Sequence, residues 1–368
     1  MLEKIDLSTF ENDSDHFGDF NLLVTIKSFD LKAIRARYVE SKKNKSGRRG
    51  SVERRDPGVG GLAYLSLKNG KLETSEVLHR LKEPRAIDVS GNRIALGAED
   101  TVYVFENGNT YRIKYPWFSY IHTVAFNPRN PNAVLIASSG LDCIFEFDYR
   151  SGKLLWEWFA WENGFNKSFK ADGSEQYLCR TLAQANALRA DGKEPRWIKD
   201  PAQDFLPTAE RAAFINSVAY RADEAPEILA TFFHEGKLFR INRENGVAIP
   251  QISALKSPHG GKHLGDNHWL VTSTATGEVV VQKEELETRI DFSQLPNKAE
   301  EMGASEWLQN TDYREGVFMT VDSNRNAFVL FDVQAKKMSV VPFDENWAVQ
   351  DLVLTSLSIE EVKRATIL

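Results

Sequence analysis

Short apolar runs alternate with turn residues along almost the whole chain. Runs rich in Val, Ile, Leu, Phe and Tyr are separated by Gly, Asn and Asp, as in RIALGA, TVYVFENG, AVLIASS and CIFEFDY. This pattern is typical of β-strands joined by tight turns. Helical spacing of apolar residues is confined to 180–213 and to the final IEEVKRAT. The pattern therefore predicts an all-β protein.

The strands group into a longer repeat. The segments that begin at His122 and Asn216 align as HTVAFNP, AVLIASS, CIFEFDY and NSVAYRA, EILATFF, KLFRIN. Looser copies begin at Pro84, Pro258 and Glu306. The starts lie about 40 residues apart once one insertion is set aside, a period at which repeats of three or four strands form β-propellers. We therefore expect a β-propeller.

The two ends of the chain supply a sixth unit. Residues 20–82 contain FNLLVTIK, LKAIRARY, GLAYLSLKNG and KLETSEVL, which we interpret as strands, and the C-terminal segment contains WAVQDLVL. A C-terminal strand that joins the N-terminal sheet would close the ring without open edges. The prediction is a six-bladed propeller over 20–368, preceded by a tail over 1–19. The alternatives are five or seven blades, two stacked β-sandwiches, or half of a propeller with a separate domain.

Composition and charge narrow the class of protein. The chain has 46 Lys and Arg against 52 Asp and Glu, a net charge of −6, which argues against general attraction to nucleic acid or to an anionic membrane. It contains no apolar run of membrane-spanning length, and its acidic N-terminus lacks the apolar core of an export signal. Two cysteines cannot form a disulfide framework. We expect a soluble cytoplasmic protein, a monomer or a dimer.

The propeller geometry predicts where polar residues meet. Inner strands line a central channel, and each inner-strand start lies on the same face as the turn between the second and third strands of its blade. Distant parts of the chain should therefore contribute side chains to one channel mouth. The expected inner-strand starts are Arg85, His122, Asn216, His259 and Trp307.

A partly desolvated imidazole at this mouth would suit proton transfer or nucleophilic work. The candidate catalytic residues are His122, His259 and His234, the last from a second-to-third-strand turn. The candidate substrate-binding residues are Arg85, Asn216, Trp161, Tyr120 and Trp307. Arg85 would bind negative charge and Asn216 would orient the substrate. The alternative is that inner-strand His and Asn only satisfy backbone groups and channel water.

Two segments are placed to cover the mouth. Residues 157–213 form a long insertion between repeats, and loops of this length usually cap a binding site. Trp161 would add an aromatic wall, whereas Trp156 and Trp158 alternate along a strand and are interpreted as packing between blades. Residues 41–58 hold seven Lys and Arg against two acids and are interpreted as a cationic flap over an anionic ligand. The alternative is a solvated loop; nucleic-acid binding would need interleaved aromatic residues.

Searches for motifs of known chemistry give no match. The sequence has no Gly-rich phosphate loop, no HExxH, no GxSxG and no CxxC. We therefore predict no cofactor and no metal-ligand residues. Scattered acids leave a channel calcium ion open as an alternative, without the fixed spacing of a calcium loop: Asp88, Asp100, Asp142 and Glu235.

One repeat carries a family resemblance. The unit H-x-V-x-F-x-P, L-I-A-S-S, I-F-E-F-D-x-R-S-G-K-L-L-W-E-W, with the later I-N-S-V and S-P-H-G, resembles propellers of the arylsulfotransferase-like group over residues 84–282. In that family, channel histidines and an arginine transfer a sulfuryl group between phenols through a sulfated histidine. The resemblance implies His122 or His259 as nucleophile or acid–base group, and Arg85 as anion clamp. Cyanobacterial enzymes that alkylate phenols or carboxylates with alkyl chlorides have similar propellers.

Together these observations predict a group-transfer enzyme with its active site in the channel mouth. Its substrate would be a small aromatic or anionic organic molecule, and its chemistry would resemble sulfuryl or alkyl transfer. The alternatives are a non-catalytic scaffold for protein–protein interaction and a hydrolase or lactonase that uses a channel metal.

Overall fold

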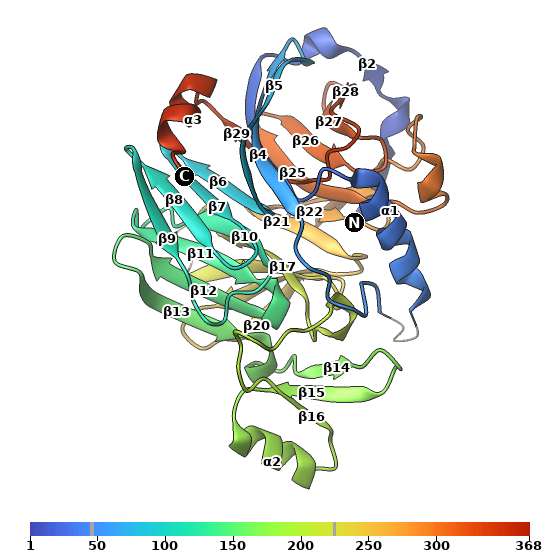
Figure 1. Ribbon diagram of the computed structural model, residues 1–368. Coiled ribbons are helices and arrows are strands. Elements are labelled where there is room, and N and C mark those ends of the chain that lie inside the picture. The colour runs from blue at the N-terminus through green and yellow to red at the C-terminus, as the bar shows by residue number, and fades with distance from the viewer. Residues whose placement is uncertain (45–47, 224–225) are drawn as a thin grey trace.

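The computed structural model describes residues 1–44, 48–223 and 226–368, and strands predominate in them (Figure 1). These residues form six sheets of four or five strands and one sheet of three strands. Each of the six larger sheets contains four antiparallel strands, and two of them gain a fifth, parallel strand. The predicted all-β class is confirmed.

Five of the larger sheets follow one another along the chain. The first two are β6 (Ala86–Ser90), β7 (Arg93–Gly97), β8 (Val102–Glu106), β9 (Asn109–Ile113), and β10 (Ile121–Phe126), β11 (Ala133–Ser138), β12 (Cys143–Asp148), β13 (Lys153–Phe159). The third is β17 (Ile215–Tyr220), β18 (Glu227–Phe232), β19 (Lys237–Asn242), β20 (Ala248–Ile252). The last two contain β21 (Pro258–Gly265), β22 (His268–Ser273), β23 (Glu278–Lys283), β24 (Leu286–Asp291), and β25 (Leu308–Arg314), β26 (Val317–Asp322), β27 (Ala327–Asp332), β28 (Lys337–Pro342).

The sixth larger sheet joins the two ends of the chain. It consists of β29 (Val349–Thr355), β3 (Phe20–Ile26), β4 (Val59–Lys68) and β5 (Lys71–Lys82). The C-terminal strand β29 pairs antiparallel with β3, from Val349 opposite Ile26 to Thr355 opposite Asn21. The expectation that the C-terminal strand joins the N-terminal sheet is confirmed. The C-terminal helix α3 (Ile359–Ala365) follows it and buries Val362.

The N-terminal residues differ from the expected tail. Within 1–19, β1 (Leu2–Asp6) adds in parallel to β24, and β2 (Glu11–Asn12) adds in parallel to β28. Leu7, Phe10 and Phe17 between and after these strands are buried. Apolar side chains in an otherwise acidic segment therefore hold it against the outer strands of two sheets.

A helix replaces one of the expected strands. Residues Leu31–Glu40, which contain LKAIRARY, form α1. The Asp30 side chain caps its first turn by accepting a backbone hydrogen bond at 2.9 Å. Leu31, Ile34 and Tyr38 have helical spacing, and all three pack in one cluster with Trp307. The strand interpretation of this segment is wrong because its apolar residues follow helical spacing and bury one face of α1.

The innermost strands surround a common centre. β6 contacts β10, β10 contacts β17, β17 contacts β21, β21 contacts β25, β25 contacts β29, and β29 contacts β6 again. The contacts between inner strands therefore form a ring, although each of the six sheets is hydrogen-bonded only within itself. This arrangement is propeller-like, and it brings the starts of the inner strands to one side of the molecule.

Tryptophans of β13 pack between two neighbouring sheets. The Trp156 Nε1 group donates to the Arg243 carbonyl at 3.1 Å, and the Trp158 Nε1 group donates to the Gly246 carbonyl at 3.0 Å. The Trp158 ring also lies 5.9 Å from the ring of Phe232 in β18. The interpretation of both residues as packing between blades is confirmed.

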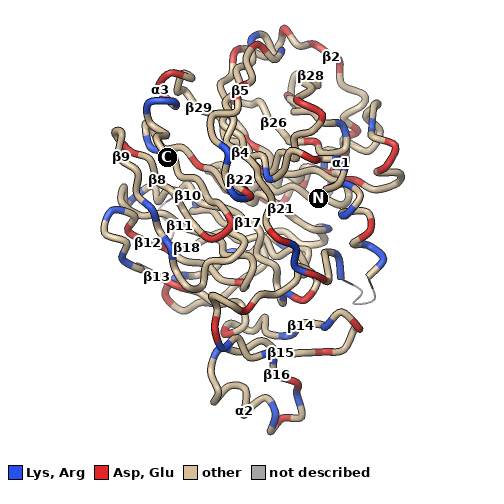
Figure 2. Tube along the Cα trace, in the orientation of Figure 1, with Lys and Arg blue, Asp and Glu red and all other residues tan. Residues whose placement is uncertain are grey.

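The insertion over 157–213 forms its own small sheet. β14 (Lys167–Phe169), β15 (Glu175–Cys179) and β16 (Pro195–Trp197) pair with one another, and α2 (Leu182–Ala190) connects the last two. Figure 1 shows this unit projecting from the main body, below β13 and β20. Charged residues of both signs are interspersed along the chain in Figure 2. In the described residues, no helix has both the length and the apolar character needed to cross a membrane.

Two aspartates, the half-buried Asp88 and the buried Asp351, tie neighbouring inner strands together. Asp88 in β6 accepts a hydrogen bond at 2.7 Å from the backbone of Phe126 in β10. Asp351 in β29 accepts one at 3.4 Å from the backbone of Ile87 in β6. Burial raises the pKa of Asp88 to about 6 and that of Asp351 to about 7. Both carboxyl groups therefore bind protons more tightly in the folded state than in the unfolded chain.

This difference predicts a pH dependence of stability. Because the folded-state pKa values are raised, the stabilisation is complete at low pH and is lost as the pH rises through about 6 to about 7. Asp351→Asn removes one of the two titrations. Between about pH 5 and about pH 8, the free energy of unfolding of the native protein should fall by roughly 1–3 kcal/mol more than that of the variant.

Urea unfolding at each pH measures this difference. The exposed residue Asp15 provides the control, and Asp15→Asn should keep the native pH slope. An Asp351→Asn protein with the native slope would contradict the role assigned to the buried carboxyl group.

Candidate functional site

Five of the six inner strands begin with an irregularity in their pairing with the second strand of the sheet. In the pairing of β10 with β11, Ile121 and Thr123 have partners but the residue between them does not. In the pairing of β17 with β18, the residue between Ile215 and Ser217 is skipped in the same way. Similar shifts occur near the starts of β21, β25 and β29, whereas β6 pairs without one. A bulge re-aims the side chain of the unpaired residue. The unpaired segments include His122, Asn216, Gly260, Gln309 and Gln350.

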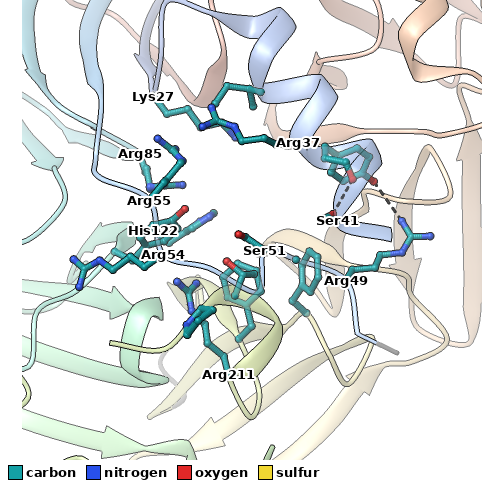
Figure 3. Close-up of a pocket in the computed structure, with 18 of the residues that line it drawn as sticks. Lys27, Arg37, Ser41, Arg49, Ser51, Arg54, Arg55, Arg85, His122 and Arg211 are labelled. Carbon is teal, nitrogen blue, oxygen red and sulfur yellow. Dashed lines mark hydrogen bonds between the residues drawn. The ribbon is translucent and has the colours of Figure 1, made fainter. Parts of the chain in front are cut away.

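These strand starts surround a cavity of about 450 Å³ (Figure 3). Residues 49–51, 53–55 and 205–208, from the two predicted covering segments, also line it. Five of the sequence-predicted site residues line this cavity: Arg85, Tyr120, His122, His259 and Trp307. The geometry therefore brings together residues that are far apart in the sequence.

His259 is held by hydrogen bonds to both ring nitrogens. Thr231 donates to the Asn216 side-chain oxygen at 2.6 Å, so the Asn216 amide nitrogen faces His259 Nε2 at 3.0 Å. Nδ1 lies 3.3 Å from the Ser257 carbonyl and 2.9 Å from the Thr274 hydroxyl. A carbonyl requires a donor, so Nδ1 carries the proton and Nε2 accepts from Asn216. Burial lowers the pKa of His259 to about 3, which keeps this ring neutral.

His122 is the less constrained imidazole. It is buried, and its ring centroid lies 5.5 Å from that of His259 and 5.9 Å from that of Phe214. Among the described residues, its ring has no hydrogen-bonding partner, and it lines the cavity. Burial is the main cause that holds the pKa of His122 well below its ordinary value, and the positive charges of Arg85 and Arg211 act in the same direction. A neutral imidazole with a free acceptor nitrogen can take a proton from a bound molecule.

Three other predicted site residues lie behind the cavity wall. Asn216 positions His259, as described above. His234 Nε2 lies 2.9 Å from the Thr208 carbonyl and thus holds the covering segment 205–208. Trp161 packs in a buried aromatic cluster, with ring centroids 5.8 Å from Trp117 and 5.7 Å from Phe159. The structure places none of the three in the cavity lining.

Positive charge dominates the lining. Figure 3 shows several of these cations converging on the cavity from different elements. Among the described residues that line it, Glu53 is the single acid, and the cations are Lys27, Arg37, Arg49, Arg54, Arg55, Arg85 and Arg211. Sequence reasoning did not single out Lys27, Arg37 or Arg211.

Some of the cations have carboxylate partners. Arg85 donates to Glu83 at 2.6 Å, and Arg55 also bonds Glu83. Arg54 donates to Glu99 at 3.0 Å. These pairs place the guanidinium groups at fixed positions on the edge of the cavity. The charge of Glu83 and Glu99 offsets only part of the positive charge in the lining.

Lys27 and Arg211 bond only to neutral acceptors in the described residues. The Lys27 amine donates to the Gln350 side-chain oxygen at 2.8 Å. Arg211 is buried, its Nε donates to the Leu206 carbonyl at 3.3 Å, and its Nη1 has no hydrogen-bonding partner in the part of the chain that the structure describes. Burial lowers the pKa of Arg211 to about 10 and that of Lys27 well below its ordinary value. Both groups are thus desolvated without a counterion.

Aromatic rings complete the wall. The Arg85 guanidinium lies 3.5 Å from the centroid of the Tyr120 ring, and that of Arg211 lies 4.5 Å from it. Tyr120 and Phe214, each immediately before an inner strand, have φ values of 58° and 49°. Bulky residues adopt this left-handed conformation only when the surrounding structure imposes it. Both residues line the cavity, so the strained positions coincide with the site.

The two covering segments touch each other. Arg48 donates to the Ala212 carbonyl at 3.0 Å, and the Ala209 backbone donates to the Ser51 carbonyl at 3.0 Å. Arg49, Arg54 and Arg55 of the segment 41–58 reach the cavity lining, whereas Lys45 lies outside the described residues. The basic segment therefore contributes positive charge to the mouth. In the residues with described positions, no group of three or more His, Cys, Asp or Glu is arranged to hold a metal ion.

No family model and no curated protein matches this sequence. The chain is similar to a solved nidogen/laminin complex, at a TM-score of 0.53 and 8% identity over 92% of this chain and 98% of that one. It is also similar to a protein of unknown function from Bacteroides caccae, at a TM-score of 0.55 and 10% identity over 92% and 100%. Virginiamycin B lyase from Staphylococcus aureus matches at a TM-score of 0.41 and 12% identity over 73% and 75%.

The first two similarities show a β-propeller fold and nothing about activity. None of these comparisons supports the arylsulfotransferase-like group in particular, so that resemblance stays a prediction.

Proposed function

We propose that the cavity binds a small organic anion and that the protein is a group-transfer enzyme in which His122 moves a proton. The observation that carries this proposal is the composition of the lining, in which six arginines and the amine of Lys27 face one acid among the described residues. The whole chain has a net charge of −6, so this concentration of positive charge is local. A local cationic cleft attracts anionic ligands even when the protein as a whole is acidic.

Two basic groups without a carboxylate partner among the described residues support an anionic ligand. Removing the charged Arg211 guanidinium from water costs free energy that no carboxylate in the described residues offsets through an ion pair, and the Lys27 amine bonds only to a neutral side-chain oxygen. A carboxylate, sulfate or phosphate in the cavity would bond to these groups and to Arg85, with the strength typical of charge-assisted hydrogen bonds.

Aromatic residues support a planar organic group on the ligand. Tyr120, Phe214, Phe233 and Trp307 line the cavity together with the cations. Their faces can stack on an aromatic ring or on guanidinium groups. An aromatic or otherwise planar anion would use both kinds of surface.

The chemistry that fits this arrangement is transfer to a hydroxyl acceptor. As the acceptor oxygen bonds to the transferred group, its proton moves to the free nitrogen of His122. The bond to the leaving group breaks, and the leaving group departs with the electron pair as an anion. Arg85 and Arg211 would stabilise that charge. Sulfuryl transfer and alkyl transfer both involve this same making and breaking of bonds. The six larger sheets would act as the six blades of the propeller that hold the site.

Neutralising a cavity cation tests anion binding. Arg37 lines the cavity and is exposed, so Arg37→Gln should fold normally; Arg211→Met removes a buried cation. Each variant should weaken binding of benzoate or para-nitrophenyl sulfate by about 10-fold or more, since hydrogen bonds to charged groups contribute roughly 1.5–3 kcal/mol. Isothermal titration calorimetry measures the affinities.

The control is Arg189→Gln, which changes an exposed arginine on α2, away from the cavity lining. It should bind both anions as the native protein does, and uncharged benzamide should bind the native protein more weakly than benzoate. Equal binding of benzoate and benzamide would contradict an anion site.

His122→Asn tests proton transfer. Asparagine occupies the equivalent bulge in β17, at Asn216, so the strand start accommodates this residue. With para-nitrophenyl sulfate as donor and phenol as acceptor, kcat should fall by about 10²–10⁴-fold while KM changes little. The control is His268→Asn. His268 is the first residue of β22 and does not line the cavity, so this variant should leave kcat unchanged. Full turnover by His122→Asn would show that another group moves the proton.

A further inference from the structure

We propose that Lys27 is a nucleophilic amine that forms an imine with the aldehyde or ketone group of an anionic substrate. The inference rests on the proposed anion site and narrows its substrate class to anionic carbonyl compounds, such as 2-oxo acids and aldehydes that carry a phosphate. A transferase site needs no such amine, so this role is separate from that of His122.

The fold fixes Lys27 at the cavity. It follows directly after β3, and its backbone nitrogen donates to the Ala348 carbonyl at 3.0 Å, next to the start of β29. The side chain is 8% exposed and lines the cavity, and Figure 3 shows its amine pointing toward the same space as Arg85 and Arg37. A molecule bound in the cavity can therefore reach the amine.

The hydrogen bonds of Lys27 suit an uncharged amine. The Gln350 side-chain nitrogen donates to the Gln309 oxygen at 3.1 Å, which turns the Gln350 oxygen toward Lys27. One N–H of the amine is bound by this oxygen, and the Trp307 ring lies 4.8 Å from the nitrogen. A neutral amine held by one donated hydrogen bond keeps its lone pair for attack on a carbonyl carbon.

The charges around Lys27 oppose its protonation. Burial is the main cause of its lowered pKa, followed by the positive charges of Arg85, Arg55 and Arg37, while Glu83 acts in the opposite direction. Glu83 is itself bonded to Arg85 and Arg55, which reduces its effect. Desolvation and neighbouring cations are the two ways in which proteins activate a lysine as a nucleophile.

The proposed step is balanced without a cofactor. The lone pair of the Lys27 nitrogen bonds to the carbonyl carbon, and the electron pair of the carbon–oxygen π bond moves to oxygen. A proton passes from nitrogen to that oxygen, and His122 is the nearby neutral base that can move it. Loss of water from this carbinolamine leaves the imine, so amine and carbonyl compound give imine and water. The anionic part of the substrate would rest against Arg85 and Arg211.

Pyridoxal 5′-phosphate is a suitable probe because it is a planar aromatic aldehyde that carries a phosphate. The native protein is mixed with a limiting amount at neutral pH, reduced with borohydride, digested and mapped by mass spectrometry. Lys27 should carry the phosphopyridoxyl group, formed on the order of 10-fold faster than on Lys32, an exposed lysine of α1. Benzoate should slow labelling of Lys27 and leave Lys32 unaffected.

The matched variants are Lys27→Met, which should lose this label, and Lys32→Met, which should keep it. Pyruvate with cyanoborohydride should also modify Lys27, whereas uncharged acetone should not. The inference would be overturned if surface lysines of the native protein were labelled and Lys27 were not. This result does not depend on the folding of any variant. If benzoate still binds in an Arg37-dependent way, the anion site survives that outcome; if benzoate does not bind, the proposed function fails too.

Discussion

The site depends on the way in which the inner strands start. Where pairing with the second strand skips a residue, that residue cannot join the ladder, and its side chain is re-aimed. The skipped segments contain His122 and Asn216 in two aligned sheets, and Gln309 and Gln350 in two others. Because the six inner strands contact one another in a ring, these local irregularities produce one polar centre.

That centre combines two kinds of group. Some are saturated and hold the geometry: His259 is bonded at both ring nitrogens, and Asn216 is bonded by Thr231. Others lack a full set of partners within the described residues, among them His122 and the Nη1 group of Arg211. Saturated groups give rigidity, whereas unsaturated buried groups cost stability and are concentrated where a ligand can bind to them. This division distinguishes His122 from His259, although the two histidines occupy similar positions at the starts of inner strands.

Much of this arrangement could be predicted from sequence because the repeat is visible. HTVA and NSVA align, which places His122 and Asn216 at equivalent strand starts. In both segments the polar residue follows an isoleucine. An apolar residue followed by a polar one also occurs at Leu308-Gln309 and Val349-Gln350, and this signal could have identified both glutamines. No repeat pattern marks Lys27, whose importance depends on burial and on cations from other segments. The saturation of His259 likewise depends on distances between strands, which periodicity cannot supply.

The central claim is that the cavity at the inner-strand starts binds an organic anion, and a crystal structure with para-iodobenzoate tests it most directly. Anomalous scattering locates the iodine independently of the protein model. The account predicts one ordered molecule in the cavity, with its carboxylate within hydrogen-bond distance of Lys27, Arg85 or Arg211 and its ring against Tyr120 or Phe214. Iodine sites confined to the outer surface, in crystals whose cavity is open to solvent, would contradict it.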